Sequence, residues 1–228
     1  MYICGHGMES NMEVSLHRKF PEIRDNGRLF YGGAQEWSTH GYVRGYGCGV
    51  IACANVLMHT VDRTSATPSK DEYIKYSRHL RKFYLPVIPK FGMNGIFMAL
   101  GVDLYFLRHR LPFYAYWGCR RKNIFKHMER MLKDDIPVVL SAGPNWPNLW
   151  GKKVLNMYEK DGDRLVRPVG MRAHYVTATA LDDEYITVSS WGRKYYIKRS
   201  DFMDYARKCS NFLFSSIMVI KPVKRRGT

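Results

Sequence analysis

The chain has 228 residues, of which 46% are hydrophobic and 14% aromatic, and its formal net charge is +16. This composition is typical of a packed globular protein and excludes an intrinsically disordered chain. A length of 228 residues suits one domain with a sizeable core. The positive charge favours polyanions or acidic partners but carries no information about the fold.

No stretch reaches the about 18 consecutive apolar residues that a membrane-spanning helix needs, and "MYICGHGMESNMEV" lacks the pattern of a signal peptide. We therefore expect a cytoplasmic protein with no membrane partner. The cysteines form no CxxC pair, which favours reduced thiols over a disulfide framework or a zinc ribbon. They are Cys4, Cys48, Cys53, Cys119 and Cys209. No histidine pair has metal-binding spacing, so we assign no metal and no cofactor.

The predicted elements follow one another in two groups. The first stretch, as far as Gly47, is rich in glycine and aromatic residues and predicts loops with one short strand near residues 29–31. Apolar residues at helical spacing then predict helices within 50–58, 67–83, 92–111 and 120–135, with Ser69 as a cap. Alternating β-branched and aromatic residues predict strands within 136–143, 154–168, 174–191 and 194–198.

Helices that precede antiparallel strands indicate an α+β fold rather than a doubly wound parallel sheet. The chain has no repeat and no Pro/Gly/Ser-rich linker, so we predict a single domain over residues 1–228. Within it we expect N-terminal loops over 1–44, a helical half over 45–133 and an antiparallel sheet half over 134–228.

One cysteine has the sequence context of a nucleophile. In "GYGCGVIACANVL", Cys48 falls in the first turn of a predicted helix, where unpaired N–H groups and the helix dipole are expected to lower the thiol pKa. Gly47 and Gly49 would leave room for a substrate, and the Cys48 amide could donate to an oxyanion. Free cysteines are also common core residues. Cys53 lies about 140° further around the helix and cannot share the site.

A histidine on a later strand could serve as the base. In "HYVTATALDDEYITVSSW", a two-residue turn at Asp182–Asp183 would set His174 opposite Trp191, with Ser189 as its neighbour on the same face. A turn of odd length would flip the second strand and present Ser190 instead. Asn145, after the strand within 136–143, is a further candidate for this third position.

These features together resemble the papain-like cysteine peptidases, in which the motif after the histidine strand reads Asn-Ser-Trp-Gly. The likeness is closer to the bacteriocin-processing, double-glycine leader peptidases and their stand-alone bacterial relatives, where Gln and Trp precede "GCG" and a small-residue helix. In this chain the matching elements are Gln35, Trp37, "GCGVIACAN" and "AHYVTATALDDEYITVSSWG".

The resemblance implies a papain-like fold, with the nucleophile helix packed on an antiparallel sheet, and cleavage of a peptide or amide bond through a thioester. It makes Cys48 the nucleophile, His174 the base and Gln35 the side-chain donor of the oxyanion hole. Ser189 stands where the family usually has Asn or Asp to orient the histidine. Trp191 is then expected to cover the bond between histidine and serine.

Two other functions remain open. A protein of the same fold could bind peptides without cleaving them, or the chain could be a basic nucleic-acid-binding protein whose Cys48 and His174 are core residues. The basic helix "RRKNIFKHMERMLK" is typical of an ordinary solvated helix face, and recognition of an acidic peptide or nucleic acid is the alternative. No zinc-finger, RRM or helix-turn-helix pattern supports sequence-specific binding. We expect a peptide or protein substrate, with acidic ones favoured by the charge, and only non-specific contact with nucleic acid.

Overall fold

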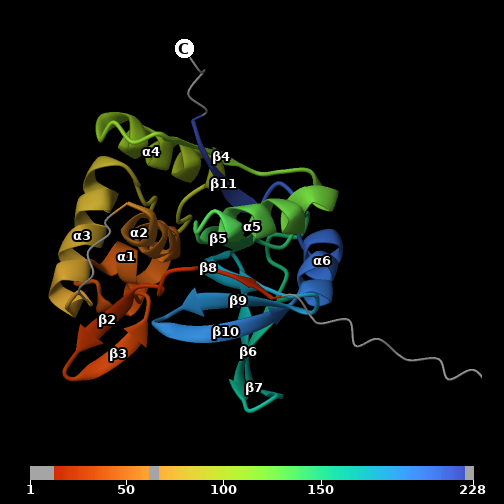
Figure 1. Ribbon diagram of the computed structural model, residues 1–228. Coiled ribbons are helices and arrows are strands. Elements are labelled where there is room, and N and C mark those ends of the chain that lie inside the picture. Colours follow the sequence, from red (N-terminus) through yellow and green to blue (C-terminus); the bar gives the residue numbers. More distant parts are fainter. Residues whose placement is uncertain (1–12, 62–66, 224–228) are drawn as a thin grey trace, which may run out of the picture.

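The computed structural model describes residues 13–61 and 67–223 and has a mixed α+β architecture with one large antiparallel sheet (Figure 1). Within this part of the chain the sheet has nine strands in the order β4-β11-β5-β8-β9-β10-β6-β7, with β1 paired to the end of β8. Strands β2 and β3 form a separate hairpin. The predicted α+β class and antiparallel sheet are therefore confirmed.

The strands are β1 Val14–Ser15, β2 Glu22–Asp25, β3 Arg28–Tyr31, β4 Phe113–Trp117, β5 Val138–Ala142, β6 Leu155–Asp161, β7 Arg164–Met171, β8 His174–Leu181, β9 Tyr185–Ser190, β10 Arg193–Lys198 and β11 Ile217–Pro222. The helices are α1 Gly41–Tyr46, α2 Cys48–Thr60, α3 Lys70–Phe83, α4 Gly95–Arg108, α5 Ile124–Lys133 and α6 Arg199–Lys208, with 3-10 turns η1 Gln35–Trp37 and η2 Arg121–Asn123.

Local sequence signals account for the starts of two helices, α3 and α4. The Ser69 hydroxyl accepts the backbone N–H of Glu72, and the Glu72 carboxylate accepts the backbone N–H of Ser69, so a capping box starts α3 as predicted. The Asn94 side chain caps α4 by accepting the backbone N–H of Ile96. Helix α2 is buried along nearly its whole length, which explains why its residues are small or apolar on every side.

Strand β8 is central to the fold because it pairs with β5 on one side and β9 on the other. All but one of its residues are buried. Helix α2 packs against β8 and β5, α5 packs against β11, β5 and β8, and α6 packs against β10 and β6. The start of α2 and the start of β8 are thereby brought together, although they lie in different halves of the chain.

Several elements were absent from the sequence prediction. The stretch expected to be loops also holds β1, β2, η1 and α1, and α6 interrupts the half expected to be strands. Strand β4 lies inside the predicted helical half 45–133 but pairs with β11 near the other end of the chain. The aromatic run of β4 lies between two strong helical patterns, and only the distant partner β11 makes it a strand.

Candidate active site

Cys48 is the first residue of α2, at the corner where α1 ends. Gly47 caps both helices, and a Cβ atom there would lie 2.5 Å from the Val43 carbonyl oxygen. The glycine therefore permits the close approach of α1 and α2 that sets the direction of α2. The Cys48 side chain is half-buried, so its sulfur lies at the edge of the core.

The pKa of the Cys48 thiol differs from the value expected at a helix N-terminus. Burial raises the pKa of the Cys48 thiol above its ordinary value, and the backbone N–H groups of Tyr175 and Gly49 counter this effect only in part. The predicted lowering of the Cys48 pKa at a helix N-terminus is therefore wrong, because desolvation outweighs the helix end. Gly49 is not an open approach either, since it is buried against Met98 and Tyr175.

His174 is the first residue of β8 and is buried. Its Nε2 atom lies 2.9 Å from the Ser190 Oγ atom, and its ring stacks on Trp191 with centroids 4.6 Å apart. Burial lowers the pKa of His174 to about 4, because the charged imidazolium loses solvation. At neutral pH the imidazole is therefore uncharged and can accept a proton.

The prediction that Ser189 faces the imidazole is wrong, and Ser190 takes that position. Leu181 pairs with Ile186 rather than Glu184, a shift of two residues that keeps the same faces together. A bulge at Thr179 then moves the register back by one residue, so the net shift is one residue and Thr177 lies opposite Ser189. Ser190 consequently shares the face of His174.

A strained hairpin turn places the tryptophan. Trp191 and Gly192 are the two residues between β9 and β10, with φ angles of 47° and 71°, as in a type I′ turn. A bulky residue seldom adopts positive φ, and such strain is often found at functional sites. The turn places the Trp191 ring against the imidazole of His174, on which it stacks.

Gln35 begins the 3-10 turn η1, which packs against α1. Its Nε2 atom donates a hydrogen bond to the Arg44 carbonyl oxygen at 3.1 Å, and its Oε1 atom is buried without a partner among the described residues. A primary amide has a second N–H on the same nitrogen. The chain between Gln35 and Cys48 folds back through η1 and α1, so both residues reach the same cavity.

A buried polar network missed by the sequence analysis holds the Gln35 segment in place. Asn55, two turns after Cys48 on α2, accepts the Gly33 N–H at 3.0 Å and the Tyr73 hydroxyl at 2.7 Å through Oδ1. Its Nδ2 atom donates to the Thr177 hydroxyl of β8 at 3.3 Å. The sequence signal was a single polar residue in the apolar run "ACANVL".

The same segment is bonded to the hairpin that carries the serines. The Ser189 hydroxyl donates to the Tyr31 carbonyl oxygen at 2.6 Å, and the Gly192 N–H donates to the Gly33 carbonyl oxygen at 3.1 Å. Ser189 therefore positions the chain before Gln35 rather than the imidazole. The nucleophile helix, the histidine strand and the Gln35 segment form one connected unit.

These elements enclose a small cavity. It is lined by Gln35, Cys48, His174, Ser190 and Trp191, together with Gly33, Ile51, Ala52, Asn55, Tyr175, Val176, Thr177 and Ser189. Its volume is about 10 Å³, room for about one water molecule or one oxygen atom. Asn145 is not part of it, because its amide bonds to Lys153 and Tyr205.

Within residues 13–61 and 67–223, no group of three or more His, Cys, Asp or Glu side chains is arranged to hold a metal ion. The same part of the chain contains no helix with the length and apolarity to cross a bilayer. No protein-family model matches the chain, and no curated protein matches its sequence significantly. The resemblance to papain-like peptidases therefore rests on sequence motifs, and the fold is established as mixed α+β with an antiparallel sheet.

Proposed function

We propose that this protein is a papain-like, thiol-dependent hydrolase that cleaves a peptide or amide bond. One observation carries the proposal: Cys48, His174 and Gln35 line a single cavity, although they come from α2, β8 and η1. A nucleophile needs a base within reach, and the base needs a group that orients it. Ser190 supplies that group through its bond to His174.

The proposed reaction starts from an uncharged pair, since burial raises the thiol pKa and lowers the imidazole pKa. With its Nε2 proton donated to Ser190, His174 holds a lone pair on Nδ1. Nδ1 takes the Cys48 proton as the sulfur attacks the carbonyl carbon, so that a C–S bond forms and the carbonyl oxygen becomes negative. The C–N bond then breaks, and the proton moves from His174 to the leaving nitrogen.

A second half-reaction releases the acid. His174 removes a proton from water as the water oxygen attacks the thioester carbon. The C–S bond then breaks, and His174 returns the proton to the sulfur, which restores the thiol and the neutral imidazole. In both halves the oxyanion would accept the Cys48 backbone N–H and the second N–H of Gln35. The size of the cavity supports this role, since it suits one oxygen atom and leaves the substrate side chains outside.

A screen of peptide libraries that include acidic sequences tests the proposal. We expect cleavage by the wild type, no product from Cys48→Ala, and full cleavage by Cys209→Ala, a matched variant at another half-buried cysteine. A peptidyl vinyl sulfone should label Cys48 in the wild type but not in His174→Ala. Equal labelling of Cys48 in the wild type and in His174→Ala, with no product from any library, would refute the proposed hydrolase activity.

The same screen distinguishes the peptide-binding alternative. A protein of this kind would retain peptides with equal affinity in the wild type and Cys48→Ala and would form no product.

A further inference from the structure

Helix α4 has apolar side chains on its outer face as well as on its inner face. The outer residues, with Phe91 just before the helix, are here called the α4 ridge: Phe91, Ile96, Phe97, Leu100, Leu104 and Leu107. Phe91 is 85% exposed, Leu107 is 75% exposed and Leu100 is 58% exposed. Large apolar side chains at such exposure, gathered on one element, indicate an interaction surface.

The ridge is separate from the face of α4 that builds the core. At about 100° per residue, its five helical members fall within an arc of about 100°. Met98, Val102 and Phe106 occupy the opposite side and are fully buried. In Figure 1 the helix lies at the edge of the molecule, far from the β2–β3 hairpin. The core therefore does not require the ridge residues to be apolar.

The charges around the ridge are almost all positive. Lys90 precedes Phe91, and Arg108 and Arg110 stand at the other end of α4. Within the described residues none of these three cations has an ion pair. The only acidic residue between Glu72 and Glu129 is Asp103, and its carboxylate accepts the Ala115 N–H.

We propose that the α4 ridge docks on a bilayer surface that contains anionic phospholipids. A bilayer receives a convex row of Leu, Ile and Phe without a matching groove, and cations at both ends of the helix can reach lipid phosphates. Contacts between proteins rely more on Trp, Tyr and Arg, and leucine is under-represented among their strongest residues. Charge complementarity and side-chain type together favour the lipid surface.

This mode of binding requires no spanning segment. The expectation of no membrane partner considered only helices that cross a bilayer, whereas a helix that lies in the interface needs only one exposed apolar face. The docking surface is also independent of Cys48 and His174, so each proposal can fail without the other.

Co-sedimentation of the full chain with vesicles tests the inference. Vesicles of phosphatidylcholine with about one third phosphatidylglycerol should bind the wild type, and pure phosphatidylcholine vesicles should bind it at least about tenfold more weakly. Leu100→Ser/Leu107→Ser should weaken binding about tenfold or more. Leu29→Ser, at a leucine of β3 that is 56% exposed, is the matched control and should bind as the wild type does.

Three outcomes would overturn the proposal. The first is no binding of the wild type to anionic vesicles. The second is equal binding by Leu100→Ser/Leu107→Ser, confirmed as folded by its thermal melt, because charge alone would then account for binding. The third is a wild-type dimer in sedimentation velocity that this variant abolishes while vesicle binding is absent, because the ridge would then be a protein interface. Reduced binding by Lys90→Glu/Arg110→Glu would support the role of the flanking cations.

Discussion

His59 and His174, the two buried histidines among the described residues, have opposite kinds of surroundings. His59 lies near the end of α2, where its Nε2 atom is 3.1 Å from the Asp135 carboxylate, and Asp135 also pairs with Arg18. His174 is bonded instead to the uncharged Ser190, next to the cavity that Cys48 lines. The histidine with the carboxylate is thus at the far end of the helix that begins with the candidate nucleophile.

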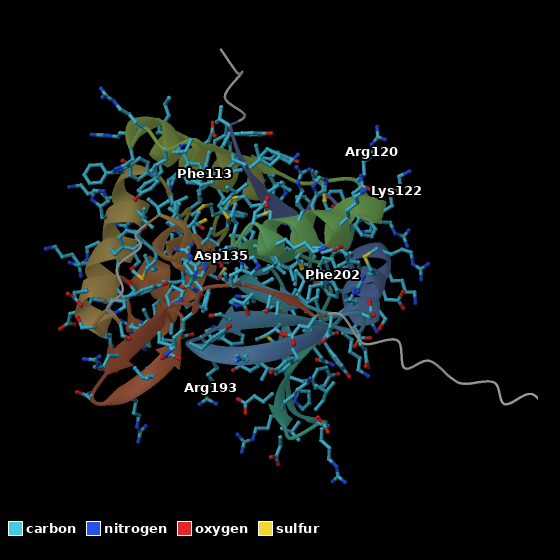
Figure 2. The ribbon with its side chains drawn as sticks, viewed as in Figure 1. Phe113, Arg120, Lys122, Asp135, Arg193 and Phe202 are labelled. Atoms are coloured by element: carbon cyan, nitrogen blue, oxygen red, sulfur yellow. The ribbon has the colours of Figure 1, made fainter. Side chains whose placement is uncertain are left out.

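The carboxylate at His59 holds separate parts of the chain together. Asp135 follows α5 and accepts the backbone N–H groups of His17 and Arg18, so it anchors the segment after β1 (Figure 2). Burial raises the pKa of Asp135, but hydrogen bonds from the side chain and backbone N–H of Arg18 and from His59 outweigh it and lower that pKa to about 2. The His59–Asp135 pair therefore connects distant segments of the fold, whereas the proposed chemistry is assigned to His174, the histidine without a charged partner.

The sharpest test of this comparison exchanges the two histidines for alanine. His174→Ala should lower the rate of peptide cleavage, or of Cys48 labelling by a peptidyl vinyl sulfone, about a thousandfold, since nucleophile and base act as a unit. His59→Ala should leave the rate per folded molecule unchanged and lower only the thermal stability. A similar loss of rate in both variants would mean that the contrast between the two sites is wrong.

The pH dependence of the free energy of unfolding should also reveal the lowered pKa of His174. Its folded pKa of about 4 lies below the ordinary value of 6.5, so between these two values the unfolded chain binds a proton that the folded chain does not. Stability should fall as pH drops from 6.5 towards 4, by about 3 kcal/mol from this residue. Urea titrations should show a weaker pH dependence for His174→Gln. An identical pH dependence in both proteins would refute the lowered pKa of His174.

Breaking the structural pair should mainly change stability. Asp135→Ala leaves His59 without its partner and removes the acceptor for His17 and Arg18. We expect a loss of about 2 kcal/mol in the free energy of unfolding, with the Cys48 labelling rate unchanged. Asp134→Ala, at the adjacent exposed carboxylate, is the control for urea denaturation. Slower labelling of Cys48 in Asp135→Ala would show that the His59–Asp135 pair affects the reactivity of Cys48, contrary to the prediction.

Substitutions of the two serines of β9 should have smaller effects, and the two variants should differ in which property changes. Ser190→Ala removes the acceptor for His174 and should slow Cys48 labelling about tenfold, because the imidazole is less firmly oriented. Ser189→Ala removes the bond to the Tyr31 carbonyl and should cost about 1 kcal/mol of stability, with a smaller change in rate. The reverse ranking in parallel labelling and melting experiments would restore Ser189 to the third position.

Local sequence determined much of this protein. The capping box of α3 and the apolar spacing of α2 each depend on interactions within a few residues. The motifs around Cys48 and His174 likewise selected two residues that the fold brings to one cavity. Such features are readable because propensity, capping and turn geometry act over short distances along the chain.

Tertiary structure alone decided the remainder. The bulge at Thr179 selects Ser190 over Ser189, and pairing between distant β4 and β11 makes a strand of an aromatic run. Desolvation raises the Cys48 pKa that its position in the helix predicted to be low. Register depends on packing across the sheet, and desolvation depends on how many atoms from the whole chain surround a group, so neither can be obtained from neighbouring residues alone.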